Sequence, residues 1–220
     1  MGSIIIASVP IHGHVTPLLN VARGFVDRGD DVRFLTGARF AEAVTAVGAT
    51  HIPLPREADY DESVLSQFPE RAKMQGARAI AFDVENIFAK PSKAQYHALL
   101  HAHRQRPADA VLFDPVFYGG GFMAGHRRDA RPALVMCGVL PLHLASRDIA
   151  PFGMGLPPAR FLNQSRNAAL SILNRRVLAG ASRVVNEFHR ELHGTELPTE
   201  LANWVRHADA IVQFTVEAFE

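Results

Sequence analysis

The amino-acid sequence predicts an α/β fold class, a doubly wound parallel β-sheet with helices on both faces. Short runs of β-branched residues alternate with stretches in which apolar residues recur every three or four positions, and glycine or proline stands between them. The chain has 220 residues, of which 48% are hydrophobic and 20% charged, a composition typical of a globular protein with a full core. We therefore expect residues 1–220 to form a single domain.

The first strand, loop and helix follow one another closely. Residues 3–9 (SIIIASV) form the continuous apolar run of a central strand that is covered on both faces. The polar, proline-containing residues 10–17 (PIHGHVTP) predict a loop. From Val15 to Val26 apolar residues recur at a helical period, and Gly29 ends the helix.

The same alternation continues along the next part of the chain. Residues 32–36 predict a strand, 39–47 a helix that Gly48 ends, and 50–54 a third strand. These are βαβ units, whose connections are right-handed. Residues 55–75 are polar and contain prolines, so we expect a loop with one short helix.

Three strands and three helical stretches complete the prediction. Alanine-rich residues 76–104 predict a helix that Pro91 interrupts, followed by a strand over 110–113, a helix over 119–128 and a strand over 133–139. Then come a loop over 151–158, an arginine-rich helical stretch over 159–193 and a last strand over 210–214. No internal repeat interrupts this order, which predicts a Rossmann-like domain.

Two polar residues stand where a doubly wound sheet binds its ligands, beyond the carboxyl ends of the strands. His14 follows the first strand at the opening of a helix, and Asp114 directly follows the fourth strand in VLFDPVF. The positive end of the helix dipole should keep the His14 imidazole neutral and able to accept a proton. A carboxylate on its other nitrogen would fix the tautomer. The pair predicts a base that activates a hydroxyl nucleophile.

The run PIHGHVTPLLNVARGFVDRGDDVRFLTGARFAEAVTAVGATHIPL over residues 10–54 resembles the opening of bacterial macrolide-type and related UDP-glycosyltransferases. In that family the histidine of a Gly-His-hydrophobic-x-Pro motif deprotonates the acceptor, which carries onto His14 in the motif that ends at Pro17. The partner aspartate of the family lies just past the fourth strand, which carries onto Asp114. The resemblance thus implies the N-terminal, acceptor-binding half of a GT-B fold in inverting family 1.

The resemblance also implies a reaction and its partners. A sugar moves from a UDP- or dTDP-sugar to a hydroxyl of a hydrophobic small molecule, with inversion and without a metal or other cofactor. Gly13 approaches the nucleotide sugar, because backbone amides at a helix start suit an anion, and His12 is expected to line the cleft. The segments that surround the acceptor in the family hold apolar residues here, namely Phe82, Phe88, Phe117, Phe152 and Met154. Each of these could equally be ordinary core.

The length of the chain departs from the family pattern. Family members have roughly one further domain, which binds most of the nucleotide sugar, and nothing like its His-Cys-Gly signature occurs in residues 1–220. We therefore expect an acceptor-binding domain without its C-terminal donor-binding domain. Such a domain should lack turnover until a donor-binding domain is supplied in cis or in trans.

Nucleic acid is not an expected partner. The 23 basic and 22 acidic side chains leave a formal net charge of +1, too little to hold a phosphate backbone or an anionic membrane by charge alone. The apolar run over 4–9 is too short for a signal peptide or a membrane span, so we expect no stable membrane insertion. The single cysteine, Cys137, fits a buried thiol in the reducing cytoplasm.

Several motifs have structural explanations that we prefer. His12 with His14, and His97 with His101, have spacings that also suit metals, but no third ligand cluster accompanies them and we expect no metal. Glycines 119–121 could hold a phosphate, yet close helix packing is favoured because the sequence has neither GxGxxG after the first strand nor a P-loop lysine. The arginines between 160 and 190 are interpreted as a solvated helix face.

Two other functions stay open on the sequence. A non-catalytic module, either a small-molecule binder or an accessory subunit of a transferase, would keep the cleft without using His14 and Asp114. A Rossmann-like hydrolase would instead be active with these 220 residues alone.

Overall fold

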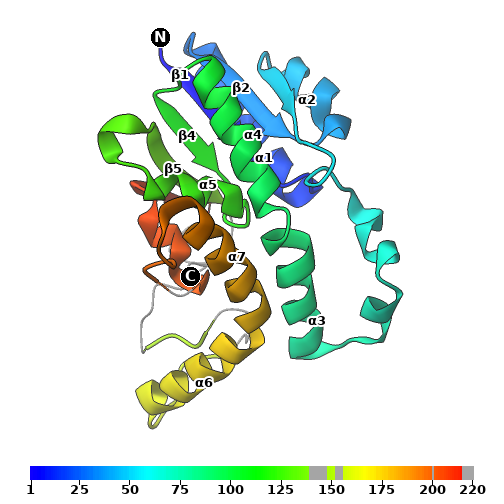
Figure 1. Cartoon of the computed structure of the whole chain (residues 1–220), viewed down its shortest axis with the longest axis vertical. Coiled ribbons are helices and arrows are strands. Elements are labelled where there is room, and N and C mark those ends of the chain that lie inside the picture. Colours follow the sequence, from blue (N-terminus) through cyan, green and yellow to red (C-terminus); the bar gives the residue numbers. More distant parts are fainter. Residues whose placement is uncertain (139–147, 152–155, 200, 215–220) are drawn as a thin grey trace.

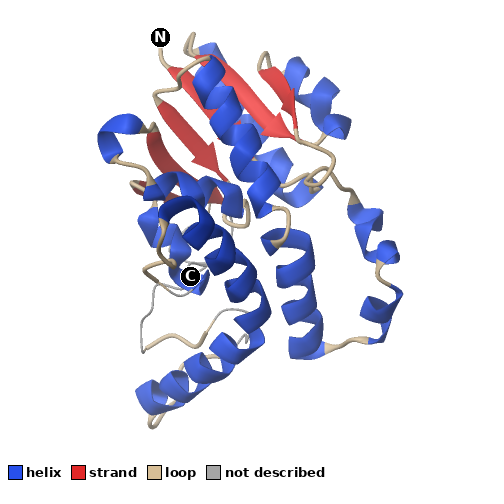
Figure 2. Cartoon of the chain, in the orientation of Figure 1, coloured by secondary structure: helices blue, strands red, loops and turns tan. Residues whose placement is uncertain are grey.

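A computed structural model describes residues 1–138, 148–151, 156–199 and 201–214 of the chain. The six strands form one parallel sheet in the order β3-β2-β1-β4-β5-β6 (Figures 1 and 2). Their bounds are β1 (Ser3–Ala7), β2 (Asp31–Thr36), β3 (Thr50–Pro53), β4 (Ala110–Phe113), β5 (Ala133–Gly138) and β6 (Ala210–Gln213). This order reverses between β1 and β4, as in a Rossmann-type sheet, and the predicted fold class is confirmed.

Seven α-helices accompany the sheet in the described residues. They are α1 (His12–Asp27), α2 (Ala41–Ala46), α3 (Gly76–Asp83), α4 (Ser92–Gln105), α5 (Tyr118–Phe122), α6 (Asn163–Val177) and α7 (Ala179–His193). Shorter helical turns are η1 (Ala38–Phe40), η2 (Glu62–Gln67), η3 (Pro69–Lys73), η4 (Val84–Ala89), η5 (Met123–Gly125), η6 (Arg128–Ala130) and η7 (Leu201–His207). Over the described part of the chain, no helix has the length and apolarity that crossing a bilayer requires.

Two apolar cores lie on opposite faces of the sheet. On one face, α1 and α2 bury residues such as Leu18 and Val44 against the strands. On the other face, α4, α5, α7 and η7 contribute a larger core that contains Tyr96, Phe122 and Trp204. Successive side chains of a strand point to opposite faces, so Ile6 of β1 belongs to the first core and Ile5 to the second. This is the doubly wound arrangement.

The predicted loop over residues 10–17 is wrong in part, because α1 begins at His12 and includes Pro17. The backbone N–H groups of His14 and Val15 both bond to the carbonyl of Ile11, at 2.9 and 3.0 Å, and this closes the first turn. Pro17 is the sixth residue of α1, where it removes the one hydrogen bond that its nitrogen would donate to the carbonyl of Gly13, and the helix nevertheless continues through it. As a result His14 belongs to the first turn of α1 and not to a loop.

Other boundaries also differ from the prediction. The helix expected over 76–104 is interrupted at Pro91 as predicted, but the π-helical turn η4, which was not expected, also precedes the interruption. The stretch expected over 159–193 is two helices that meet at Leu178. The helix expected over 119–128 shortens to α5 with a 3-10 turn. Val139, predicted to end the fifth strand, lies outside the described residues.

The glycine run in α5 lies at the point where α5 contacts its neighbours closely. A Cβ atom on Gly119 would lie 2.6 Å from the backbone nitrogen of Tyr96, and one on Gly120 would lie 2.7 Å from the ring of Phe113. Such distances leave no room for a side chain. The packing interpretation of these glycines is therefore confirmed.

Candidate functional site

His14 and Asp114 meet at the carboxyl edge of the sheet. Strands β1 and β4 are parallel neighbours with Ala7 opposite Phe113, so the residues that follow the two strands emerge side by side. The strand order reverses between β1 and β4, and such a reversal opens a crevice at the carboxyl ends of the strands. The sequence placed both residues at this edge, and the structure brings them into contact.

The imidazole and the carboxylate form a hydrogen-bonded pair. His14 Nδ1 lies 3.2 Å from Asp114 Oδ1. The backbone N–H of Val9 donates to Asp114 Oδ2 at 2.7 Å, and the N–H of Val116 donates to Oδ1 at 2.9 Å. The Asp114 side chain is only 2% exposed, whereas that of His14 is 25% exposed. The carboxylate is therefore fixed inside the protein while one edge of the imidazole reaches solvent.

The environment of His14 favours its protonated form. Burial lowers the pKa of His14, but the hydrogen bond and the negative charge of Asp114 outweigh burial and raise that pKa above its ordinary value. We expected the helix dipole to favour the neutral ring, and this expectation is wrong, because a carboxylate in hydrogen-bond contact is a stronger influence than the partial charge of a helix end.

This geometry gives the pair a defined chemical capacity. A carboxylate on Nδ1 holds the proton on that nitrogen and leaves the lone pair of Nε2 free. When Nε2 takes up a proton, the resulting imidazolium faces a carboxylate that stabilises it. The pair can therefore act as a base of raised basicity toward a group placed near Nε2.

A cavity of about 240 Å³ adjoins the pair. Its lining combines the dyad with mainly apolar residues from α1, β5 and the residues that directly follow β4 and β6, namely Gly13, His14, Pro17, Leu18, Asp114, Pro115, Cys137, Gly138 and Phe214. Burial and the charge of Asp114 raise the pKa of the Cys137 thiol to about 12. The thiol is therefore neutral at physiological pH and contributes an apolar wall.

The sequence analysis assigned no site role to Cys137 and Phe214. Cys137 was recognised as a buried thiol, and the structure buries it to 1% exposure. Both residues occur at or near the carboxyl ends of predicted strands, which was the available signal. The pairing of β5 with β6 brings these strand ends together.

The other predicted binding residues are distributed unevenly. Gly13 lines the cavity beside the dyad. His12 is exposed and packs edge-on against Phe40 at a ring separation of 4.9 Å, away from the cavity lining. Phe117 has no exposed surface and belongs to the core that α4, α5 and α7 form. In this structure Phe117 therefore offers no surface to a ligand.

Phe82 and Phe88 lie on α3 and η4, and both are half-buried. Phe82 packs edge-on against Phe68 at a ring separation of 5.2 Å, and Phe88 packs against the larger core. Neither belongs to the lining of the cavity beside the dyad. Phe152 and Met154 lie outside the described residues.

The described residues hold no group of three or more histidine, cysteine, aspartate or glutamate side chains that could bind a metal ion. His97 and His101 are exposed on α4, as expected for a solvated helix face. The candidate site therefore consists of the dyad and its apolar cavity.

Curated relatives of this chain are glycosyltransferases. The 4'-demethylrebeccamycin synthase of Lentzea aerocolonigenes is 32% identical over 221 residues, a match that covers 99% of this chain and 52% of the relative. UDP-glycosyltransferase 2 of Phaeomoniella chlamydospora is 29% identical over 225 residues and is covered to 50%. The chain thus spans about half the length of these relatives. No protein-family model matches the chain.

Solved structures of glycosyltransferases share the fold. The glycosyltransferase SsfS6 of Streptomyces sp. SF2575 superposes with a TM-score of 0.62 at 12% identity, over 100% of this chain and 52% of that one. Spinosyn rhamnosyltransferase complexed with spinosyn aglycone gives 0.55 at 14% identity, over 97% and 44%, and its thymidine diphosphate complex gives 0.53 at 13%, over 90% and 43%. Together these matches show that the chain is similar to glycosyltransferases over about half of their length, and that it has the fold of one half of a GT-B glycosyltransferase.

Proposed function

We propose that this chain is the acceptor-binding half of an inverting glycosyltransferase, with His14 as the general base and Asp114 as the residue that orients it. The observation that carries the proposal is the 3.2 Å contact between His14 Nδ1 and a buried carboxylate, which leaves Nε2 directed away from its partner. A base with this orientation suits the removal of a proton from a hydroxyl nucleophile.

In the proposed reaction, an acceptor hydroxyl lies beside His14 Nε2. Its oxygen bonds to the anomeric carbon of the sugar as its proton passes to Nε2, and the bond from that carbon to the diphosphate oxygen breaks. The nucleoside diphosphate leaves with the electron pair of that bond, and the configuration at the anomeric carbon inverts. Asp114 stabilises the imidazolium that forms. No metal or other cofactor takes part in the proposal.

The substrates follow from the cavity and from the relatives. Pro17, Leu18 and Phe214 give the cavity apolar walls, and such walls bind a hydrophobic acceptor mainly through the area it buries. The spinosyn rhamnosyltransferase structures hold an aglycone in one case and thymidine diphosphate in another. We propose by analogy a hydrophobic small-molecule acceptor and a UDP- or dTDP-sugar, the latter bound mainly by a donor-binding domain in cis or in trans.

The start of α1 supports a place for the diphosphate. Gly13 is exposed and a Cβ atom on it would meet nothing within 4 Å, so the first turn of this sixteen-residue helix is open to a ligand. The N–H groups of a first helical turn suit an anion. We propose that this turn contacts the sugar diphosphate while the apolar cavity receives the acceptor.

The test is His14→Ala in a complete protein, or in this chain reconstituted with a donor-binding domain. Turnover of nucleotide sugar should fall by about 10³-fold or more, while acceptor binding, measured by calorimetry, stays within a few-fold. His97→Ala is the matched control, because His97 is exposed on α4. Unchanged turnover in His14→Ala would overturn the role of His14 as the general base, and acceptor binding without turnover in the parent protein would support a non-catalytic binding module. Turnover by the 220 residues alone would support a hydrolase.

A further inference from the structure

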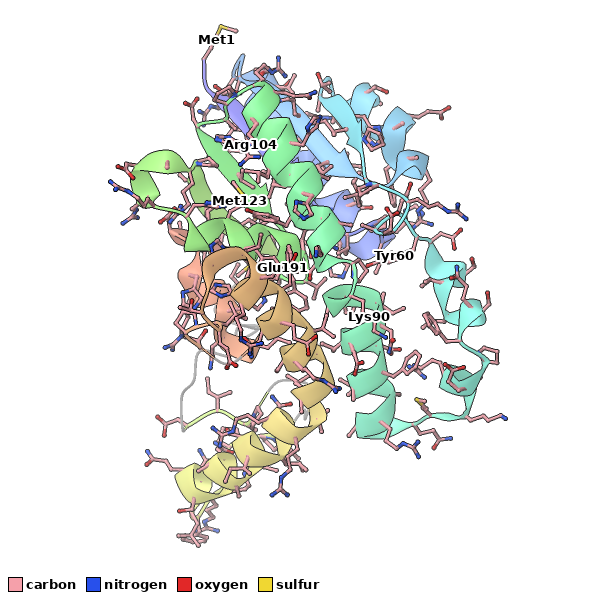
Figure 3. All side chains as sticks on the ribbon, in the orientation of Figure 1. Met1, Tyr60, Lys90, Arg104, Met123 and Glu191 are labelled. Atoms are coloured by element: carbon pink, nitrogen blue, oxygen red, sulfur yellow. The ribbon has the colours of Figure 1, made fainter. Side chains whose placement is uncertain are left out.

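Helix α6 is covered by the rest of the described structure to an unusually small extent. It extends away from the sheet at one end of the molecule (Figure 1), and many of its side chains project into open space (Figure 3). Asn167 is its only buried residue among those described. A helix of a globular domain normally buries one apolar stripe. We therefore expect the exposed surface of α6 to contact a partner.

That exposed surface includes large apolar side chains. Phe161 and Leu162, just before the helix, are 76% and 80% exposed, and Ile172 and Leu173 within it are 48% and 50% exposed. Two pairs of adjacent exposed apolar residues thus lie on α6 and the turn before it, and gathered apolar exposure commonly marks a binding surface. We call these four residues the α6 apolar surface.

The backbone holds two of these side chains outward. Leu162 has a φ angle of +52° and is the only residue other than glycine with a positive φ among the described residues. The neighbouring Asn163 fixes the turn, because its Oδ1 accepts from the N–H of Ala159 at 2.8 Å and its Nδ2 donates to the carbonyl of Asp148 at 2.7 Å. Strained backbone tends to persist at functional positions.

The same region is strongly basic. Residues 149–186 contain five arginines, no lysine and no acidic residue, although the whole chain has a formal charge of only +1. The five are Arg160, Arg166, Arg175, Arg176 and Arg183. Arg160 lies beside the α6 apolar surface, with its guanidinium carbon 5.3 Å from the centre of the Phe161 ring. Acidic side chains also contact this region, since Asp148 accepts from Gln164 at 3.0 Å and Glu187 lines a cavity with Arg175 and Arg183. Arg160 and Arg176 are exposed, which favours a partner that is anionic and able to accept apolar side chains.

We propose that α6 and the turn before it dock on the surface of an anionic lipid bilayer. Exposed aromatic and leucine side chains beside arginines are the composition of helices that lie in the membrane interface. Phe161 and Leu162 are adjacent and 76% and 80% exposed, so both side chains are accessible for insertion between lipid headgroups. Arginines attract anionic lipids locally even when the overall charge is near zero. The contact is peripheral, and it does not depend on the proposed transferase activity.

Vesicle co-sedimentation of the 220-residue chain tests the proposal. We expect binding to vesicles of phosphatidylcholine with phosphatidylglycerol, and at least about tenfold weaker binding to phosphatidylcholine alone or in high salt. Phe161→Ser should reduce binding about tenfold. Leu65→Ser is the matched control, since Leu65 is also exposed, at 41%, but lies on η2. Equal losses in the two variants, or no binding by the parent chain, would overturn the proposal.

Charge reversal separates local from overall electrostatics. Each arginine near an anionic surface contributes about fivefold to binding, so Arg160→Glu with Arg176→Glu should abolish the preference for phosphatidylglycerol. Arg23→Glu with Arg56→Glu makes the same change in net charge at exposed positions outside the region and should have a small effect. Similar effects of the two pairs would refute a local docking surface. Circular dichroism melts verify that each variant is folded.

Two other partners, a second copy of the chain and a donor-binding domain, are tested by light scattering and by vesicle binding. Light scattering that shows a dimer lost in Phe161→Ser would assign the surface to a second copy of the chain and overturn the proposal. Vesicle binding that disappears when the chain is joined to a donor-binding domain would assign the surface to a contact between the two domains, which is equally contrary to it.

Discussion

Histidines occur in two contrasting regions of the molecule. At the carboxyl edge of the sheet, His14 contacts the carboxylate of Asp114 and has a raised pKa. Around α7, His126, His193 and His207 have no carboxylate contact of this kind in the described structure, and burial is the main cause of their lowered pKa values. The surroundings therefore shift the pKa of the same kind of side chain upward in one region and downward in the other.

The hydrogen-bond partners of the histidines around α7 carry no negative charge, so they do not outweigh burial as Asp114 does for His14. His126 Nε2 pairs with the hydroxyl of Tyr96 at 2.7 Å, and His193 Nε2 with the carbonyl of Phe122 at 3.0 Å. The rings of His193 and His126 are 5.3 Å apart, and those of His193 and His189 are 4.8 Å apart. Protonation of one ring therefore disfavours protonation of the next, and positive arginines lower the pKa of His126 further. This arrangement attaches α7 to the core, whereas the dyad faces a cavity.

The largest expected effect comes from removing the charge that distinguishes the two regions. Asp114→Asn leaves a group of similar shape but removes the negative charge, so the pKa of His14 should fall and turnover should decrease about 10³-fold or more in the complete enzyme. Steady-state kinetics measures the loss. Asp129→Asn is the control, because Asp129 is exposed and pairs with Arg127. Turnover within tenfold of the parent for Asp114→Asn would contradict the proposed role of the carboxylate.

The second expected effect is a loss of stability at acid pH that arises from the three histidines around α7, namely His126, His193 and His207. Their pKa values are lower in the folded chain than in the unfolded chain, where 6.5 is the ordinary value, so unfolding takes up protons. The stability they contribute is present above pH 6.5 and is lost as pH falls through the folded pKa values. In urea unfolding, His193→Gln should lose less stability between pH 7.5 and 5.5 than the parent chain.

His97→Gln is the control for that comparison, because His97 is exposed. Its stability should depend on pH as the parent chain does. An identical pH dependence in His193→Gln and the parent chain would show that this histidine is not held neutral by the fold.

The smallest effect is a pair of opposite titration shifts, which NMR of the imidazole resonances resolves. His14 should titrate above 6.5 and His193 below it. The sign for stability is also opposite, because the His14 pair stabilises the fold below pH 6.5 and this contribution is lost as pH rises through the raised pKa. Titration of His14 below 6.5 would mean that burial outweighs Asp114 in solution.

The sequence predicted correctly the features that depend on residues close together in the chain. A buried strand followed by a polar residue placed both His14 and Asp114 at a sheet edge, and general rules for α/β sheets made them neighbours. It did not find the start of α1, because two hydrogen bonds to Ile11 offset the preference of Pro17 for a loop. It gave the wrong direction for the pKa of His14, because that direction depends on a distance that no sequence pattern contains.

The remaining features depend on contacts between distant parts of the chain. Cys137 and Phe214 reach the cavity only because β5 and β6 pair. The contact of His126 with His193 joins residues that are far apart in the sequence. The overall composition did not indicate the membrane surface proposed for α6. Acidic residues elsewhere in the chain balance its local excess of arginine, so the net charge is only +1.

The Asp114 carboxylate is bonded to the main chain at Val9 and Val116. Main-chain groups are the same whatever side chains surround them, so the alignment of the proton-accepting pair does not rest on the residues that shape the cavity. Replacing Phe214, which is only partly buried, can therefore alter which molecule fits without disturbing the reactive atoms. Substitutions in the apolar lining of this cavity could therefore change the specificity while the proton-accepting pair stays intact.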